Sequence, residues 1–253
     1  METLLNVYDS IATRMGSWNY HRVWTTYLMT VSFVGALLIM CCDKISFTDA
    51  FFLTSSGVTG TGLIVVAMSS LNPGSLFVIL FCVFLGNGVV LLIPGLLYRQ
   101  HKFRQICDEG GSSVTECRAY SEYRKIYDAI GATVTAIRIY IVFFQVGGTF
   151  LYFFALLTKP PNPALQEAGF SLFTDAVFTL NSAFCNAGYT LTDSGLSWQA
   201  GNAFSYLVLC VVMVGGNLGT PFLFRWLVQL IVKVHHAAGN SAEAAPYEYM
   251  LGK

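Results

Sequence analysis

Two short segments of the chain have the composition needed to bind a cation through the peptide backbone. They are TGTG at residues 59–62 and CNAG at residues 185–188, and each is uncharged and ends in glycine. Glycine tolerates positive φ and puts no side chain in the way, so its carbonyl oxygen can face a narrow aqueous path. Carbonyl oxygens arranged in this way replace the hydration shell of K⁺. The predicted K⁺ ligands are therefore the backbone carbonyl groups of Thr59, Gly60, Thr61, Gly62, Cys185, Asn186, Ala187 and Gly188.

Both segments belong to a unit that the chain contains twice. FTDAFFLTSSGVTGTGL, residues 47–63, recurs 126 residues later as FTDAVFTLNSAFCNAGY. Seven positions are identical without a gap, where unrelated sequences would share about one. Gly62 and Gly188 each lie 13 residues after the aspartate of their FTDA motif, so Gly62 rather than Gly60 is the expected equivalent of Gly188. The two aspartates, Asp49 and Asp175, are expected at the N-termini of short helices, where a negative charge is stabilising.

The composition is that of a protein that crosses a membrane several times. Of its 253 residues, 55% are hydrophobic and only 11% are charged, and the mean hydropathy is +0.58. A soluble domain would carry roughly twice this share of charge. The net charge of zero gives no reason to expect nucleic acid as a partner. The motifs of an intramembrane enzyme, such as G-x-S-x-G or H-E-x-x-H, are missing, so we expect neither enzyme activity nor a cofactor.

Four apolar stretches are long enough to cross a hydrocarbon core of about 30 Å as helices. Between them, each copy of the repeated motif is too short and too polar to span. Non-helical backbone survives at membrane depth only where it lines an aqueous path or is buried in protein. We therefore predict an all-α polytopic membrane protein with two tandem M1–pore helix–M2 repeats and re-entrant pore loops. The predicted spans are residues 24–42, 76–97, 126–157 and 203–234, and the pore helices with their filters are residues 47–63 and 170–191.

The same pattern predicts how the chain is divided and oriented. A polar stretch with several arginines separates the repeats and is expected to be a loop. With both termini in the cytoplasm, twelve of the fourteen basic residues fall on the cytoplasmic side, as the positive-inside rule requires. The expected location is the plasma membrane. The predicted parts are residues 1–98 (first repeat), 99–125 (cytoplasmic linker), 126–236 (second repeat) and 237–253 (polar cytoplasmic tail).

Three stretches resemble the Trk/Ktr/HKT superfamily of potassium and sodium transporters: TGLIVV, SAFCNAGYTL and GNLGTPFLFR, which begin at Thr61, Ser182 and Gly216. The resemblance implies a fold of four M1–pore–M2 units around one pore, of which this chain holds the first two. It also implies that glycine at the Gly62 position favours K⁺, whereas serine there would favour Na⁺. A cytoplasmic regulatory subunit is a further candidate partner. A Na⁺-preferring transporter remains an alternative.

Two filter segments cannot surround an ion, because the other half of the filter would face lipid. The expected partner is either a missing second half with repeats three and four or a second copy of the chain, and the polar, truncated-looking tail favours the missing half. The glycine pairs at residues 147–148 and 215–216 are the expected partner contacts. A non-conducting truncated or accessory half-subunit is the alternative to a conducting role.

Overall fold

The computed structural model describes residues 20–108, 114–160, 163–167 and 169–252, and these residues form helices and loops without any β-strand. Two helical stretches, Arg22–Cys42 and Glu122–Leu156, are long and apolar enough to cross a membrane. Two further helix pairs pass the same test together, Pro73–Gly86 with Gly88–His101 and Ala203–Gly216 with Thr220–Ala237. The described residues thus supply up to four candidate spans if each interrupted pair counts as one. This agrees with an all-helical membrane protein.

The chain forms two compact units. One, here called the motif unit, comprises Asn19–Val90 and Val142–Thr220 and contains both FTDA motifs. The other, here called the flanking unit, contains Leu91–Ile141 and Pro221–Lys253.

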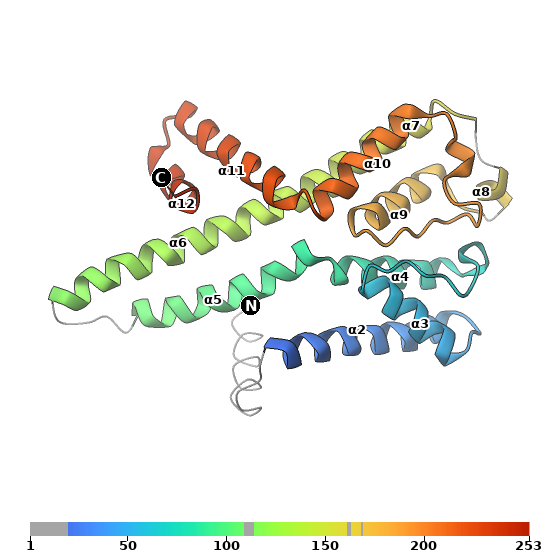
Figure 1. Cartoon of the computed structure of the whole chain (residues 1–253), viewed down its shortest axis with the longest axis horizontal. Helices are drawn as coiled ribbons and strands as arrows, with labels where there is room; N and C mark the ends of the chain where they lie inside the picture. The colour runs from blue at the N-terminus through green and yellow to red at the C-terminus, as the bar shows by residue number, and fades with distance from the viewer. Residues whose placement is uncertain (1–19, 109–113, 161–162, 168, 253) are drawn as a thin grey trace. The chain divides into compact units, whose positions relative to one another are not determined.

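The first half of the motif unit is a long helix, a short helix and a second apolar helix. Ser46 caps the short helix by accepting a hydrogen bond from the Asp49 amide, and Pro73 starts the next helix at a position where no amide hydrogen is needed. The Asp43 carboxylate accepts a 2.7 Å hydrogen bond from the Asn72 side chain and so joins the ends of the two apolar helices. The elements, blue to teal in Figure 1, are α2 (Tyr20–Cys42), α3 (Phe47–Val58), η1 (Met68–Ser70) and α4 (Pro73–Gly86).

The second half repeats this order. Its long helix is interrupted by one π-helical turn, and a short helix and a second apolar helix follow. The apolar helices α4 and α10 have the same length, 14 residues, and each ends at a glycine followed by asparagine. The elements are η2 (Phe143–Gly147), α7 (Gly148–Leu156), α8 (Pro163–Glu167), α9 (Leu172–Phe184), η3 (Ser197–Gln199) and α10 (Ala203–Gly216).

Matching glycines allow close packing in both halves. A Cβ added to Gly86 would overlap the Val58 carbonyl oxygen at the end of α3, and one added to Gly216 would overlap the Phe184 carbonyl oxygen at the end of α9. The outer surface of the unit is apolar, with Phe77 68% exposed and Leu207 61% exposed. Apolar side chains on the outside of well-packed helices suit a lipid environment.

The flanking unit corrects one expectation. The segment 99–125, expected as a loop, is helical where it is described, because α5 (Gly88–Asp108) continues to Asp108 and α6 (Val114–Val142) begins at Val114. The tail, expected to be polar, contains α12 (Ser241–Met250), whose Tyr247 is buried against α6 and α11 (Thr220–Ala237). This small core consists of Ala132, Ala136, Val228, Val232 and Tyr247.

Candidate functional site

The two predicted filter segments have the same backbone conformation. Gly60 and Gly62 have φ of 64° and 73°, and their equivalents Asn186 and Gly188 have φ of 57° and 72°. Asn186 has the only positive φ of a non-glycine residue among the described residues. Left-handed backbone is costly for an L-residue, although asparagine tolerates it better than most. Residue 186 therefore has the same left-handed backbone conformation as its equivalent Gly60, although it is not a glycine.

Each segment is held by the last turn of the short helix before it. The Thr61 amide donates to the Ser56 carbonyl over 2.9 Å, and the Ala187 amide donates to the Ser182 carbonyl over the same distance. Ser56 and Ser182 are identical in the sequence repeat, but sequence reasoning gave them no role. The two serines differ in their hydroxyls, because Ser56 Oγ accepts from the Leu63 amide at 2.7 Å, whereas Ser182 Oγ is buried with no partner among the described residues.

The two segments lie against one another. A Cβ added to Gly62 would overlap the Ala187 carbonyl oxygen, and one added to Gly60 would lie 3.1 Å from the Cys185 carbonyl oxygen. The backbone of the first segment thus touches the backbone of the second. Gly188 differs, because nothing in the described structure lies within 4 Å of a Cβ placed there.

The side chains of the eight predicted residues divide between surface and interior. Thr59 and Thr61 are exposed, and their hydroxyl oxygens lie 2.8 Å apart. In the second segment Asn186 is exposed, while Cys185 and Ala187 are 7% and 3% exposed. None of these side chains carries a charge, so the backbone carbonyl groups are the strongest potential ligands of this site.

Tyr189, which follows the second segment, fastens it to the first half of the unit. Its side chain is 1% exposed, and its hydroxyl donates to the Leu53 carbonyl of α3 over 3.0 Å. Its ring also lies 3.5 Å from a Cβ placed on Gly57. The equivalent residue after the first segment is Leu63, which is 57% exposed.

Asn87 is a site residue that sequence reasoning missed. Its side-chain amide donates to the carbonyl oxygens of Phe184 and Gly216, both over 3.3 Å, and its Oδ1 accepts from the Val89 amide over 2.9 Å. Asn87 is 5% exposed. It thereby links the break after α4 to the end of α9. The recurring Gly-Asn pair was a signal for this role, although by itself it indicates only a bent helix.

A second asparagine, Asn181, forms a hydrogen bond from the second half of the unit to the first, whereas Asn87 bonds from the first half to the second. Asn181 of α9 donates through its Nδ2 to the Leu80 carbonyl of α4 over 3.2 Å and accepts from the Gln145 side chain over 3.0 Å. Unlike Asn87, it has no asparagine counterpart in the other repeat, where Ser55 stands. The contact between the halves is therefore polar at several points around the two segments.

The two aspartates differ in a way that their shared motif does not predict. Asp49 sits beside its cap, with its amide donating to Ser46 Oγ over 3.1 Å and its Oδ2 accepting from the same hydroxyl over 2.7 Å. In α9 the cap is Ser171, which accepts from the Thr174 amide instead. Asp175 lies one residue further into the helix, is 2% exposed, and has an Oδ2 without a described partner.

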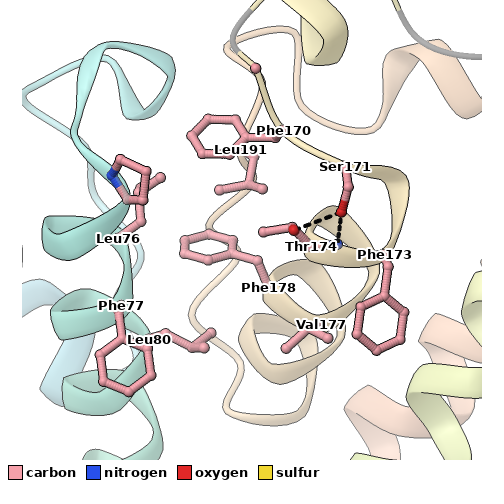
Figure 2. Close-up of a pocket in the computed structure, with 12 residues that line it drawn as sticks. Leu76, Phe77, Leu80, Phe170, Ser171, Phe173, Thr174, Val177, Phe178 and Leu191 are labelled. Atoms are coloured by element: carbon pink, nitrogen blue, oxygen red, sulfur yellow. Dashed lines mark hydrogen bonds between the residues drawn. The ribbon is translucent and has the colours of Figure 1, made fainter.

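An apolar pocket of about 560 Å³ opens between α4 and the start of α9. Figure 2 shows Leu76 and Leu80 of α4 facing Phe178 and Leu191, with the bonded pair Ser171 and Thr174 at one side. A dehydrated cation needs several oxygen ligands, and this lining offers few. The lining therefore gives no reason to place a cation in this pocket.

The glycine pairs expected as partner contacts are mostly used inside the unit. A Cβ on Gly148 would meet the Leu180 side chain at 3.2 Å, and one on Gly215 would press on the Phe144 ring at 2.5 Å. Gly216 lies against the Phe184 carbonyl, and only Gly147 has open space. These glycines bring α7 and α10 close to their neighbours, so they are not a free partner face.

The chain is similar in sequence to known cation transport proteins. Residues 21–247 match the model of the TrkH family, described as cation transport proteins. The rice (Oryza sativa subsp. japonica) cation transporter HKT2;4 is 24% identical over 201 residues, which cover 72% of this chain and 39% of that protein. A protein of Dictyostelium discoideum that is provisionally named a potassium transport protein is 34% identical over 77 residues, 30% of this chain and 12% of that protein. The matches span less than half the length of both relatives.

Proposed function

The chain belongs to the TrkH family of cation transport proteins, and on that premise we propose that it carries a monovalent cation, K⁺ in the first place, through a filter of backbone carbonyl groups. It is an integral membrane protein of a family of transporters rather than enzymes. The carbonyl groups are those of residues 59–62 and 185–188. This chain supplies half of the pore.

One observation supports the proposal above the others. The two segments differ in sequence at three of four positions, yet they share positive φ at both equivalent positions and the same amide-to-carbonyl bond from the helix before them. The first positive φ of each segment, with this bond, is a common helix C-cap that also follows α8 and α11 at Gly169 and Gly239. The second positive φ, at Gly62 and Gly188, sets the two segments apart from these caps. Coordination of an ion by carbonyl oxygens is a role that depends on the backbone and not on the side chain.

The preference for K⁺ is proposed from the residue at position 62. A glycine there keeps Cβ away from the Ala187 carbonyl, so the carbonyl oxygens of the two segments can lie close together without a hydroxyl between them. The two alternatives are a Na⁺-preferring pore and a non-conducting accessory half. The open space beside Gly188 agrees with a site that one chain leaves incomplete.

The orientation is also part of the proposal. Both termini are placed in the cytoplasm, because this leaves only Lys44 and Lys159 of the fourteen basic residues on the outer side. The filter segments then enter the membrane from outside. A cysteine-accessibility assay on intact cells would test this placement through exposed positions such as Ser70.

Transport itself is tested by uptake of ⁸⁶Rb⁺, a K⁺ substitute, into liposomes that contain the purified chain, with unlabelled K⁺ or Na⁺ as competitor. The proposal predicts uptake that K⁺ suppresses at lower concentration than Na⁺ does. Stronger competition by Na⁺ would favour the Na⁺-preferring alternative. An absence of uptake by correctly inserted protein, over the whole range of protein density, would mean that copies of this chain alone do not form a pore, as expected for a non-conducting half or for a half that needs a separate second half.

A further inference from the structure

The two filter segments, residues 59–62 and 185–188, are kept from approaching one another by direct backbone contact. A Cβ added to Gly62 would overlap the Ala187 carbonyl oxygen, and one added to Gly60 would lie 3.1 Å from the Cys185 carbonyl oxygen. The two backbones are therefore already in close contact. Repulsion between these atoms sets a lower limit to the separation of the segments, but it does not stop the segments from moving apart.

The hydroxyl group of Tyr189 supplies an upper limit. It donates to the Leu53 carbonyl over 3.0 Å and lies 3.5 Å from the Leu63 carbonyl oxygen. Leu53 belongs to α3, the helix that leads into the first segment, and Leu63 directly follows Gly62. The residue after Gly188 thus holds backbone on both sides of the first segment, and its hydrogen bond to Leu53 resists separation of the two segments.

The part of the first repeat that Tyr189 holds is itself tied together. The Leu63 amide donates to Ser56 Oγ of α3 over 2.7 Å, so the end of the first segment is fixed to its own helix. The Tyr189 ring lies 3.5 Å from a Cβ placed on Gly57, which is also in α3. A displacement of α3 would therefore carry the end of the first segment with it, and the Tyr189 hydroxyl opposes that displacement.

The hydroxyl is not needed to fill the space around the ring. Tyr189 is 1% exposed, and a phenylalanine would occupy nearly the same volume without a polar atom to bury. Burying a hydroxyl costs free energy that a hydrogen bond has to offset. The equivalent residue after the first segment is Leu63, which has no hydroxyl and is 57% exposed. The repeat therefore does not require this group, and its bond to α3 is particular to the second segment.

We propose that the Tyr189 hydroxyl is a positioning group that fixes the separation of the two filter segments and thereby supports discrimination between K⁺ and Na⁺. The inference rests on the proposed function. Discrimination between the two ions depends on how the carbonyl oxygens are spaced and how freely they move. With the hydroxyl removed, the backbone contact at Gly62 still prevents closer approach, but the segments are free to separate, and mobile oxygens adapt to either ion.

The first test measures the separation of the segments and does not require conduction. Spin labels are attached to Leu63→Cys and Thr190→Cys, which follow the two segments, in a full chain whose exposed cysteines are serine, and the distance between the labels is measured in liposomes by electron paramagnetic resonance. Tyr189→Phe removes the hydroxyl alone. Tyr152→Phe is the matched control, because Tyr152 is 0% exposed and its hydroxyl bonds Gln199 of the same repeat over 2.6 Å.

We expect a narrow distribution of label distances for the unsubstituted Tyr189 background and for Tyr152→Phe, and a broader one with a longer mean for Tyr189→Phe. An unchanged distribution in Tyr189→Phe, or equal broadening in Tyr152→Phe, would overturn the inference.

The second test, on unlabelled protein, is competition of K⁺ and Na⁺ with ⁸⁶Rb⁺ uptake. The ratio of the Na⁺ to the K⁺ concentration that halves uptake should fall roughly two- to tenfold in Tyr189→Phe, the range expected for the loss of one hydrogen bond, and stay unchanged in Tyr152→Phe. A conducting Tyr189→Phe protein with the wild-type ratio would overturn the role in discrimination. A wild type without uptake counts against the proposed function, and the label distances then decide the positioning role by themselves.

Discussion

At the scale of single residues, the site depends on backbone that only a few residue types adopt. Four positions in two segments have positive φ, and three of them are glycine. Sequence spacing identified Gly62 and Gly188 as equivalent, and the structure gives them φ values within one degree of each other. The sequence spacing gave no reason to expect positive φ at Asn186, because asparagine is common in many other settings. The backbone conformation of residue 186 depends on the path of the chain after α9, and the residue type alone does not reveal that path.

Replacing Gly188 by valine should abolish cation flux while leaving insertion in the membrane intact. A β-branched residue at φ of 72° is strained by about 1–2 kcal/mol or more, and relief of that strain rotates the carbonyl away from the ion path. Gly195→Val is the control, because Gly195 also has positive φ, 61°, and open space around its Cβ position, but lies outside the filter. Uptake of ⁸⁶Rb⁺ by Gly188→Val at the wild-type rate would refute the assignment.

Serine at residue 62 should shift the cation preference toward Na⁺ more than serine at residue 60. A Cβ at Gly62 overlaps the Ala187 carbonyl oxygen, so the two segments must separate, whereas a Cβ at Gly60 lies 3.1 Å from the Cys185 carbonyl oxygen and needs only a small adjustment. Reversal potentials under mixed K⁺ and Na⁺ would measure the shift. If the two variants are indistinguishable, Gly62 has no special place in the filter.

At the scale of elements, the sequence predicted the long apolar helices but neither the helical structure of the segment between the repeats nor the contacts between the repeats. The predicted first and third spans, 24–42 and 126–157, overlap two helical stretches that are long and apolar enough to cross a membrane, Arg22–Cys42 and Glu122–Leu156. The arginine-rich segment was expected as a loop because its side chains are polar. Polarity also suits an amphipathic or solvated helix, and α5 and α6 show that outcome. Contacts such as those of Asn87 join residues about a hundred positions apart, which no local pattern reveals.

The junction between α4 and α3 gives a prediction for stability. Gly86→Ala forces a methyl group into the Val58 carbonyl and should lower the free energy of unfolding by about 1–3 kcal/mol. Gly88→Ala, two residues away with nothing within 4 Å, should change it by less than about 0.5 kcal/mol. Thermal unfolding in detergent, followed by circular dichroism, compares the two. Equal effects would show that Gly86 is not held against α3.

At the scale of the whole molecule, the described residues supply two segments of the proposed filter. The first segment is covered by the second, whereas nothing in the described structure lies within 4 Å of a Cβ placed on Gly188. The resemblance noted in the sequence already suggested an incomplete pore, since two filters cannot enclose an ion. What the sequence could not show was which surface is incomplete, because that follows from comparing the surroundings of equivalent residues in the two repeats.

The most direct measurement is ⁸⁶Rb⁺ uptake into liposomes as a function of the number of chains in each vesicle. The chain is diluted until most protein-containing vesicles hold one copy, and copy number is counted in the same sample. If this chain supplies half of the pore, vesicles with one copy take up no ⁸⁶Rb⁺, and uptake needs a second copy or a separate second half in the same vesicle. Uptake by vesicles that contain a single copy would contradict the half-pore account.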